Sequence, residues 1–389
     1  NSESWNYRDR VLFCEEVDLR RIAREVGTPV YVYSYRHLIE KYRELEQAWS
    51  DIEHLICFSL KSNSSRAVAR ALFREGAGAD VVSGGEFRRA LTAGVDPEKI
   101  VFAGIGKTAA EIKLALESGL LFFTVESAPE LDRINEIAGQ LGRSAPVALR
   151  VTPDVDPETH TYITTGKAEN KFGLDLEEAV TFYRSCRRMA NINPVGIHMH
   201  IGSQILSPDP YVEALKKLVI LVRELKKAGI ELNYLDIGGG MGVNYRDDSP
   251  ASAEDYVRAL LPLLKGLEMT LVVEPGRFLT ANSGCLLCRV EYIKKKARKN
   301  FIIVDAAMND LIRPVLYEAY HQIIPVEERE NEPLEADVVG PICETGDCLG
   351  ESRFIPEPEE NDLLAIMSAG AYGLVMSSIY NSRPRPPEV

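Results

Sequence analysis

The stretch CFSLKSN, residues 57–63, is a short apolar run that ends on Lys61. Lysine is rarely placed at the end of a buried strand for packing, because its charge is costly to remove from water. Desolvation favours the neutral amine, and a neutral lysine amine can form a Schiff base with an aldehyde. A lysine in this place is more often a surface residue whose stem lies on the apolar run. The residues farther along the chain decide between the two interpretations.

Short apolar runs alternate with amphipathic helical segments from about residue 35 to residue 277. The runs that we predict to be strands are residues 52–60, 79–83, 100–103, 122–125, 147–151, 195–200, 234–237 and 269–273. The helical patterns between them include residues 65–75, 86–93, 108–117, 129–141 and 211–228. Eight β/α units in about 245 residues have the size and pattern of a closed parallel (β/α)8 barrel of the TIM type. A doubly wound open sheet is the alternative, because periodicity does not show closure.

This rhythm stops after the eighth run. Strand-like runs then succeed one another without long helices, at residues 285–292, 301–304, 336–339 and 363–367. We therefore predict an α/β chain with a barrel over residues 35–278. Residues 1–34 and 279–389 would form a β-rich domain, a sandwich or small barrel that the N-terminal strand at residues 28–33 completes. Between residue 11 and that strand we expect an irregular segment.

The composition excludes several classes of function. The chain has 389 residues and a net charge of −13, which argues against binding to nucleic acid or to an anionic membrane surface. No apolar run approaches the roughly 18 residues of a membrane span. Seven cysteines, an odd number in a long chain, argue against a disulfide framework, so we expect a cytoplasmic protein. Cys285 and Cys288 lie in a predicted strand, where residues three apart point to opposite faces, so we predict no metal site.

Polar and glycine-rich clusters come after five of the eight predicted strands. They are Lys61, Asp80 with residues 83–86, residues 200–203, residues 236–242 and residues 274–277. In a β/α barrel the carboxyl ends of all strands lie on one rim, and the chemistry is found there. The clusters are therefore expected to lie close together.

The glycines of residues 238–240 and the histidines before them suggest how a ligand is held. A glycine loop lets backbone N–H groups face a phosphate, and this loop comes after the seventh strand, where barrel phosphate sites often lie. A tight turn is the alternative. His198 and His200 point to the same face of a strand. They could be a metal-binding pair, partners of a planar cofactor, or satisfied histidines of the barrel interior.

A buried lysine, a phosphate loop, a partner for a flat ring and an acid together describe a site for pyridoxal 5'-phosphate (PLP). Lys61 would hold the aldehyde carbon, and Glu274 would pair with the pyridine nitrogen. A carboxylate in that place keeps the nitrogen protonated and makes the ring a strong electron sink. A strong sink suits loss of a carbon substituent, such as decarboxylation.

With these residues the chain resembles the barrel-type PLP-dependent amino-acid decarboxylases from about residue 20 to its end. The motifs that it shares are FSLKSN (58–63), HMHIGSQ (198–204), DIGGG (236–240), EPGR (274–277), IRPVLY (312–317), CETGD (343–347) and YNSRPRP (380–386). The chain departs from the usual pattern at Ser59 and Ser62, where this family more often has alanine.

The resemblance implies a function for individual residues. Lys61 would bind the cofactor, His200 would stack on its ring, and Asp80 would support the lysine. The residues implied to contact the cofactor phosphate or ring are Ser203, Gly239, Gly240, Glu274, Pro275, Gly276, Arg277 and Tyr372. Cys343 would donate the proton that replaces carbon dioxide. In this family Cys343 and Glu344 would reach the partner's site, which implies a homodimer with shared active sites.

The resemblance also implies a substrate, meso-2,6-diaminopimelate, which would be converted to L-lysine and carbon dioxide. Its second amino-acid end needs a guanidinium fork for the carboxylate and an acid for the ammonium group. The residues that resemble this clamp are Arg277, Arg313, Tyr317, Tyr372 and Glu344. One alternative is decarboxylation of another basic amino acid or of carboxynorspermidine. Others are a PLP racemase and a non-catalytic PLP carrier. The acid at Glu274 argues against the racemase.

Overall fold

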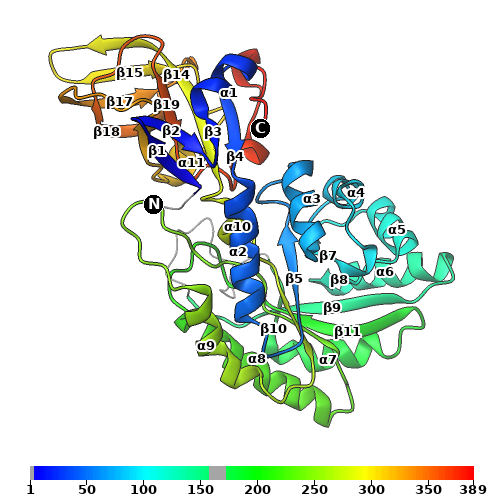
Figure 1. Ribbon diagram of the computed structural model, residues 1–389. Helices are drawn as coiled ribbons and strands as arrows, with labels where there is room; N and C mark the ends of the chain where they lie inside the picture. The colour runs from blue at the N-terminus through cyan, green and yellow to red at the C-terminus, as the bar shows by residue number, and fades with distance from the viewer. Residues whose placement is uncertain (1–3, 157–171) are drawn as a thin grey trace. The chain divides into compact units, whose positions relative to one another are not determined.

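The computed structural model describes residues 4–156 and 172–389. The chain divides into two compact units (Figure 1). We call residues 42–242 with 249–276 the barrel unit. We call residues up to Lys41, residues 243–248 and residues 277–389 the β unit.

The barrel unit is built on a closed sheet of eight parallel strands, counted within the described residues. They are β5 (His54–Ser59), β6 (Gly78–Val81), β7 (Ile100–Phe102), β8 (Phe122–Val125), β9 (Ala145–Thr152), β11 (Ile192–His198), β12 (Tyr234–Asp236) and β13 (Thr270–Val273). Each strand pairs with its neighbours in parallel, and β8 pairs with β9, which closes the ring. The predicted barrel is therefore confirmed, and the open sheet is excluded. The short strand β10 (Leu174–Asp175) is added beside β9.

The helices between these strands cover the outside of the barrel, as α3 to α6 do in Figure 1. They are α3 (Arg66–Glu75), α4 (Gly84–Ala93), α5 (Ala109–Ser118), α6 (Ala128–Gln140), α7 (Leu176–Cys186), α8 (Asp209–Lys227) and α9 (Ala253–Leu264). Local chemistry sets their ends. Thr108 and Glu111 form a reciprocal capping box at the start of α5, and Gly119 ends that helix at φ +80°, a conformation that glycine adopts without strain.

The β unit contains a mixed sheet with the long strand β14 (Gly284–Lys295) at its centre. Its other strands are β4 (Val30–Tyr33), β15 (Asn300–Val304), β16 (Ile323–Pro325), β17 (Pro333–Val339), β18 (Cys348–Pro356) and β19 (Leu363–Ile366). The N-terminal β4 pairs antiparallel with β14, so the prediction that an N-terminal strand completes this domain is confirmed (Figure 1).

Strand alternation explains the two closely spaced cysteines of β14. Cys285 packs in one hydrophobic cluster and Cys288 in another, because residues three apart in a strand point to opposite faces. All seven cysteines of the chain have free thiols.

The segment from residue 11 to β4 is not irregular, contrary to our expectation. It contains β2 (Val11–Cys14), β3 (Val17–Asp18) and helix α1 (Leu19–Val26), and β2 also pairs with β1 (Trp5–Arg8). Asp18 accepts a hydrogen bond from the backbone of Arg20 and so caps α1. The helix has only eight residues and is stabilised by the burial of one apolar face. Eight residues are too few for the helical periodicity to be recognised in the sequence.

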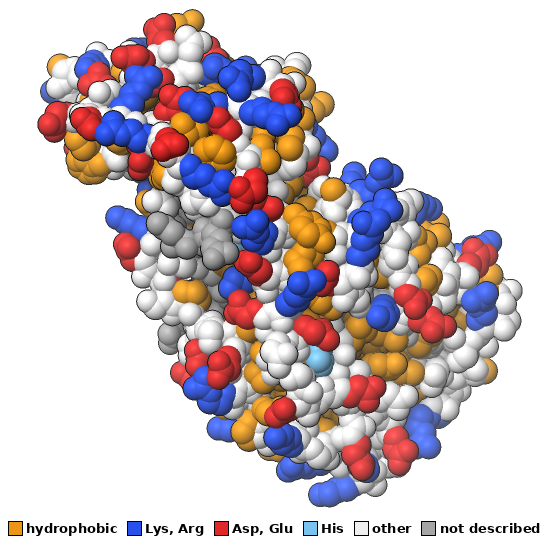
Figure 2. Space-filling view, in the orientation of Figure 1, with side chains coloured by type: hydrophobic (Ala, Val, Ile, Leu, Met, Phe, Trp, Pro, Cys, Tyr) orange, Lys and Arg blue, Asp and Glu red, His pale blue; other side chains and the backbone are white. Residues whose placement is uncertain are grey.

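Acidic and basic side chains are interspersed over the face of the molecule drawn in Figure 2. Neither sign forms a continuous field there. Among the described helices, we find none that is both long enough and apolar enough to cross a membrane.

The remaining α-helices are α2 (Tyr35–Ala48), α10 (Arg277–Thr280) and α11 (Arg313–Tyr317).

Candidate active site

Lys61 lies just beyond the end of β5, and its amine contacts a buried carboxylate. Lys61 Nζ donates a hydrogen bond to Asp80 Oδ2 at 3.1 Å, and the Ser59 hydroxyl donates to the same oxygen at 2.6 Å. The Asp80 side chain is fully buried, whereas that of Lys61 is 34% exposed. Burial and the nearby charge of Glu274 raise the pKa of Asp80, while Lys61 and Ser59 act in the opposite direction. The lysine is therefore accessible, and a carboxylate orients it.

Glu274 comes directly after β13 and lies in a cluster of buried ionisable groups. His198 Nε2 lies 3.4 Å from Glu274 Oε2. Burial alone would raise the pKa of Glu274, but His198 and Lys61 lower it to about 2. Burial and the charge of Glu274 raise the pKa of Asp236 well above its ordinary value. Because the two carboxyl groups are close, ionisation is favoured at Glu274 and the protonated form is favoured at Asp236.

The glycine loop after β12 packs against the ends of neighbouring strands. Gly238 and Gly240 have φ angles of +70° and +116°, and a side chain at Gly239 would overlap the Glu274 carbonyl oxygen. The Gly238 N–H donates to Asp236 at 2.8 Å, and the Gly239 N–H donates to His200 Nδ1 at 3.2 Å. The Gly240 N–H has no partner among the described residues. Glycine is thus needed for close packing, and one N–H remains available for a ligand.

His200 is neutral. Burial of its ring, with the positive charges of Lys61 and Arg150, lowers the pKa of His200 well below its ordinary value. Since Nδ1 accepts the Gly239 N–H, the ring proton is on Nε2. A neutral ring held by the glycine loop is suited to stacking on a flat ligand. Ser203 lies in the next turn of the chain.

The β unit holds a second group of predicted residues around Tyr245. Arg277, the first residue of α10, donates to the Tyr245 hydroxyl at 2.7 Å and lies 4.9 Å from the Tyr372 ring centroid. Arg313, the first residue of α11, lies 4.6 Å from the Tyr245 ring centroid. Arg277 is 6% exposed and Arg313 is 5% exposed. Tyr317 ends α11 and is partly buried.

A neutral histidine accepts a hydrogen bond from Arg313. Arg313 donates to His321 Nε2 at 2.9 Å, and His321 Nδ1 donates to the Met367 carbonyl oxygen at 2.9 Å. Burial and the positive charge of Arg313 lower the pKa of His321 to about 3. Within the described residues, Arg313 is paired with no carboxylate and contacts His321 and the Tyr245 ring instead. A buried guanidinium without an anion is costly, so this arrangement indicates an anionic ligand.

Cys343 and Glu344 lie in an exposed loop of the β unit between β17 and β18. The Cys343 N–H donates to Asn381 Oδ1 at 2.8 Å, and the Tyr380 hydroxyl donates to Glu344 at 3.3 Å. Asp347 fixes the loop, because its carboxylate accepts backbone hydrogen bonds at 2.8 Å and 2.7 Å from Ile342 and Met308. The two side chains are thus presented to solvent from a well-anchored loop.

Sequence reasoning missed three residues of these groups. Asp236 stood inside a recognised motif, directly before the glycine loop, but its acid had no assigned function. Tyr245 and His321 gave no signal in the sequence, because neither belongs to a periodic run or a motif.

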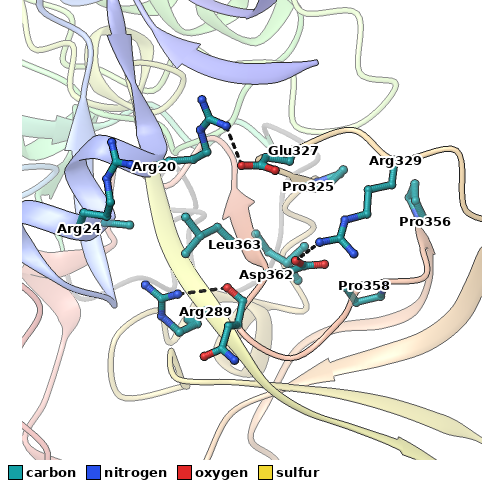
Figure 3. Close-up of a pocket in the computed structure, with 13 residues that line it drawn as sticks. Arg20, Arg24, Arg289, Pro325, Glu327, Arg329, Pro356, Pro358, Asp362 and Leu363 are labelled. Carbon is teal, nitrogen blue, oxygen red and sulfur yellow. Dashed lines mark hydrogen bonds and ion pairs between the residues drawn. The ribbon is translucent and has the colours of Figure 1, made fainter. Parts of the chain in front are cut away.

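The β unit also contains a cavity of about 260 Å³ that none of the predicted site residues lines (Figure 3). Four arginines surround it, but carboxylates or carbonyls already engage three of them. Arg20 pairs with Glu327 at 2.9 Å, and Arg329 pairs with Asp362 at 2.5 Å. Arg289 donates to a backbone carbonyl. The cavity is an ion-paired groove with little uncompensated charge.

A lysine amine beside a carboxylate, an ionised acid and a glycine loop at the strand ends of a barrel define an enzyme class. Members of this class bind a cofactor that has an aldehyde and an anionic group: the lysine amine binds the aldehyde, and the glycine loop faces the anionic group. The chain belongs to the pyridoxal-dependent decarboxylases. The family model described as "Pyridoxal-dependent decarboxylase, pyridoxal binding domain" matches residues 35–281.

Full-length relatives agree with this family. Diaminopimelate decarboxylase of Pseudomonas aeruginosa is 50% identical, over 100% of this chain and 93% of that protein. The enzyme of the same name from Aquifex aeolicus is 49% identical, over 98% of this chain and 91% of that protein. The crystal structure of Helicobacter pylori diaminopimelate decarboxylase complexed with L-lysine matches with a TM-score of 0.92 and 42% identity, covering 95% of this chain and 93% of that one.

Pyridoxal 5'-phosphate is the cofactor that the family implies, and the residues present fit it. Lys61 is partly exposed, as an amine that binds an aldehyde must be. Glu274 Oε1 is buried and has no hydrogen-bond partner in the described part of the chain, so an acceptor is available for a protonated ring nitrogen. The N–H of Gly240 is available for a phosphate oxygen.

Proposed function

We propose that this protein decarboxylates meso-2,6-diaminopimelate, with PLP as cofactor, to give L-lysine and carbon dioxide. Relatives that are 49% and 50% identical over almost the whole chain bear the name diaminopimelate decarboxylase. The observation that supports the substrate within this molecule is the pair of buried arginines, Arg277 and Arg313, beside Tyr245.

We assign the cofactor to residues at the strand ends of the barrel unit, to their neighbours in sequence and to Tyr372. Lys61 binds the aldehyde carbon, Glu274 accepts a hydrogen bond from the ring nitrogen, and neutral His200 contacts the ring face. The residues proposed to contact the phosphate are Ser203, Gly239, Gly240, Pro275, Gly276, Arg277 and Tyr372. Bound PLP supplies the aldehyde for the substrate amine and the electron sink that takes up the electron pair left by carbon dioxide.

Glu274 determines how strong that sink is. Its pKa of about 2 keeps it ionised at neutral pH, so it favours a protonated ring nitrogen. Burial and the charge of Glu274 raise the pKa of the neighbouring Asp236, which favours its neutral form and disfavours a second negative charge. Such a site suits removal of a carboxylate more than the balanced proton transfers of a racemase.

Arg277 and Arg313 would bind the distal carboxylate of the substrate, with Tyr317 and Tyr372 beside it. Their guanidinium groups are desolvated, so each charged hydrogen bond is worth more than at the surface. A substrate without the distal carboxylate would leave both cations unpaired. Sites built to bind a polar group reject analogues that lack it by about 10⁴-fold or more. Glu344 would bind the distal ammonium group.

We assign proton donation to the reacting carbon to Cys343, which the partner subunit of a homodimer would supply together with Glu344. Both side chains are exposed and lie on an anchored loop, as residues that complete another subunit's site must be. Seven free thiols are consistent with a reducing cytoplasm, where we expect the protein.

The test is the release of lysine and carbon dioxide from meso-diaminopimelate by PLP-loaded protein, beside ornithine, arginine and carboxynorspermidine. We expect turnover of the first substrate only. Turnover of another would retain the cofactor assignment and refute the distal clamp. Epimerisation without carbon dioxide would indicate a racemase. Covalently bound PLP with no turnover of any substrate would refute the proposal and indicate a carrier.

A further inference from the structure

Asp80 receives both of its described hydrogen bonds at one oxygen, and the donors come from the end of β5 and the turn that follows it. Ser59 is the last residue of β5 and Lys61 lies in the turn two residues on, and both donate to Asp80 Oδ2. The second oxygen, Oδ1, is buried and has no partner among the described residues. The ionisation of this carboxyl group therefore depends on two donors.

The Ser59 hydroxyl is held in place by its backbone. The Ser59 N–H donates to the Pro275 carbonyl oxygen at 3.1 Å, and the Ser59 carbonyl oxygen accepts from the Ser62 N–H at 3.0 Å and from the Ser62 hydroxyl at 2.8 Å. Ser59 is 2% exposed. Its side chain consequently has little freedom to leave Asp80.

This hydroxyl has two acceptors within reach but only one proton. Asp80 Oδ2 is 2.6 Å away, and the Glu274 carbonyl oxygen is 3.1 Å away. The shorter distance is typical of a hydroxyl that donates to an ionised carboxylate. If Asp80 took up a proton, it would donate to Ser59, and the Ser59 proton would turn to the Glu274 carbonyl. The hydroxyl thus distinguishes the two protonation states of Asp80.

The surroundings of Asp80 otherwise favour its neutral form. Burial and the negative charge of Glu274 raise the pKa of Asp80, and Lys61 and Ser59 lower it. The ionisable groups that influence Asp80 electrostatically are Cys57, Lys61, Glu86, Asp236 and Glu274. Only Lys61 among them is a cation, and Lys61 is the residue that must leave to bind the cofactor.

We propose that Ser59 is a positioning residue: its hydroxyl holds the Asp80 carboxylate ionised and aimed at Lys61, and remains its donor when the Lys61 amine is bonded elsewhere. This inference rests on the proposed function, because it takes Lys61 as the amine that binds the cofactor. A charge-assisted hydrogen bond exceeds a neutral one by enough to shift the carboxyl titration by about one pH unit.

The experiment follows the Asp80 carboxyl carbon by NMR in apoprotein labelled with ¹³C at the aspartate carboxyl groups, with Asp80→Asn to assign the signal. We expect the Asp80 midpoint to lie above 3.8 in the unaltered protein. Ser59→Ala should raise it by about one pH unit. The shift should be larger between Lys61→Met and Lys61→Met with Ser59→Ala, since Ser59 is then the remaining donor.

Ser62→Ala is the matched control, because it removes a buried hydroxyl from the same turn that donates to the Ser59 carbonyl oxygen. Its Asp80 midpoint should stay in place, because the Ser59 backbone keeps its bonds to the Ser62 N–H and to the Pro275 carbonyl oxygen. If the alanine variant does not fold, Ser59→Cys replaces it in the experiment. Because a thiol is a weak donor, Ser59→Cys should raise the Asp80 midpoint by a smaller amount.

In the PLP-loaded enzyme, the acidic limb of kcat/KM against pH should move upward with the Asp80 midpoint in Ser59→Ala. An unchanged Asp80 midpoint in both backgrounds overturns the inference, and so does an equal shift in Ser62→Ala. Failure of the unaltered enzyme to decarboxylate any substrate would overturn the proposed function instead, and the apoprotein titration separates the two.

Discussion

Replacing Arg313 with methionine should separate the stability of this protein from its activity. Arg313 is 5% exposed, and its guanidinium contacts the Tyr245 ring and neutral His321. Burial and the charge of Arg277 lower the pKa of Arg313, because they disfavour the cation. The fold therefore bears the cost of burying this charge, and we propose that the ligand offsets it.

The magnitude is set by the bonds that would be lost. A guanidinium fork gives a carboxylate two charged hydrogen bonds, each worth about 1.5–3 kcal/mol. Loss of about 3–4 kcal/mol of transition-state binding lowers kcat/KM for diaminopimelate by about 10²–10³-fold. Methionine fills similar volume without a charge, and the groups that lose a partner are the His321 acceptor and Tyr245. The free energy of unfolding should hence change by no more than about 1 kcal/mol.

The assay compares kcat/KM for meso-diaminopimelate, and denaturant unfolding, between the unaltered protein and Arg313→Met. Arg289→Met is a control from the same unit, since Arg289 is partly buried and donates to a backbone carbonyl. It should leave kcat/KM unchanged. Retention of kcat/KM within about threefold in Arg313→Met would refute the clamp, because even one charged bond is worth more. A large loss of stability with proportionate loss of activity would indicate a structural arginine.

Three further predictions concern the cofactor, the partner subunit and pH. Asp236→Asn should keep most PLP affinity, because burial beside Glu274 already favours a neutral group at this position and the amide oxygen can still accept the Gly238 N–H. Asp236→Ala removes that acceptor and should weaken PLP binding. Equal losses in equilibrium titrations would contradict this. Lys61→Ala should abolish turnover and Cys343→Ala should slow it by orders of magnitude. When the two variants are mixed and exchange subunits, part of the activity should return. Subunit exchange verified by mass spectrometry without any recovery would exclude shared sites. The pKa of His321 is about 3 in the folded state and 6.5 in the unfolded state, so on acidification the unfolded state takes up the proton first. The free energy of unfolding should therefore fall by about 2 kcal/mol from pH 7 to pH 5 through this residue. In urea unfolding, His321→Gln should lack that part of the pH dependence.

The sequence by itself determined the barrel strands, the β-rich second unit and most of the residues proposed for the site. Each of the eight predicted runs overlaps a strand of the closed sheet. The reason is local: parallel strands are buried on both faces, and their covering helices are amphipathic, so both leave a periodic signal in the sequence. Polar residues at the end of such runs must share one rim, which is why Lys61, Asp80 and Glu274 could be grouped without coordinates.

Only the tertiary structure decided what depends on contacts between distant residues. Closure of the barrel is the pairing of β8 with β9, and periodicity is the same in an open sheet. Tyr245 contacts Arg277 across 32 residues, so no local pattern marks it. The protonation of Asp236 and the neutrality of His321 result from burial beside particular charges, which a sequence does not specify. Residue types fix which chemistry is available to this chain, and burial fixes which of those groups are charged.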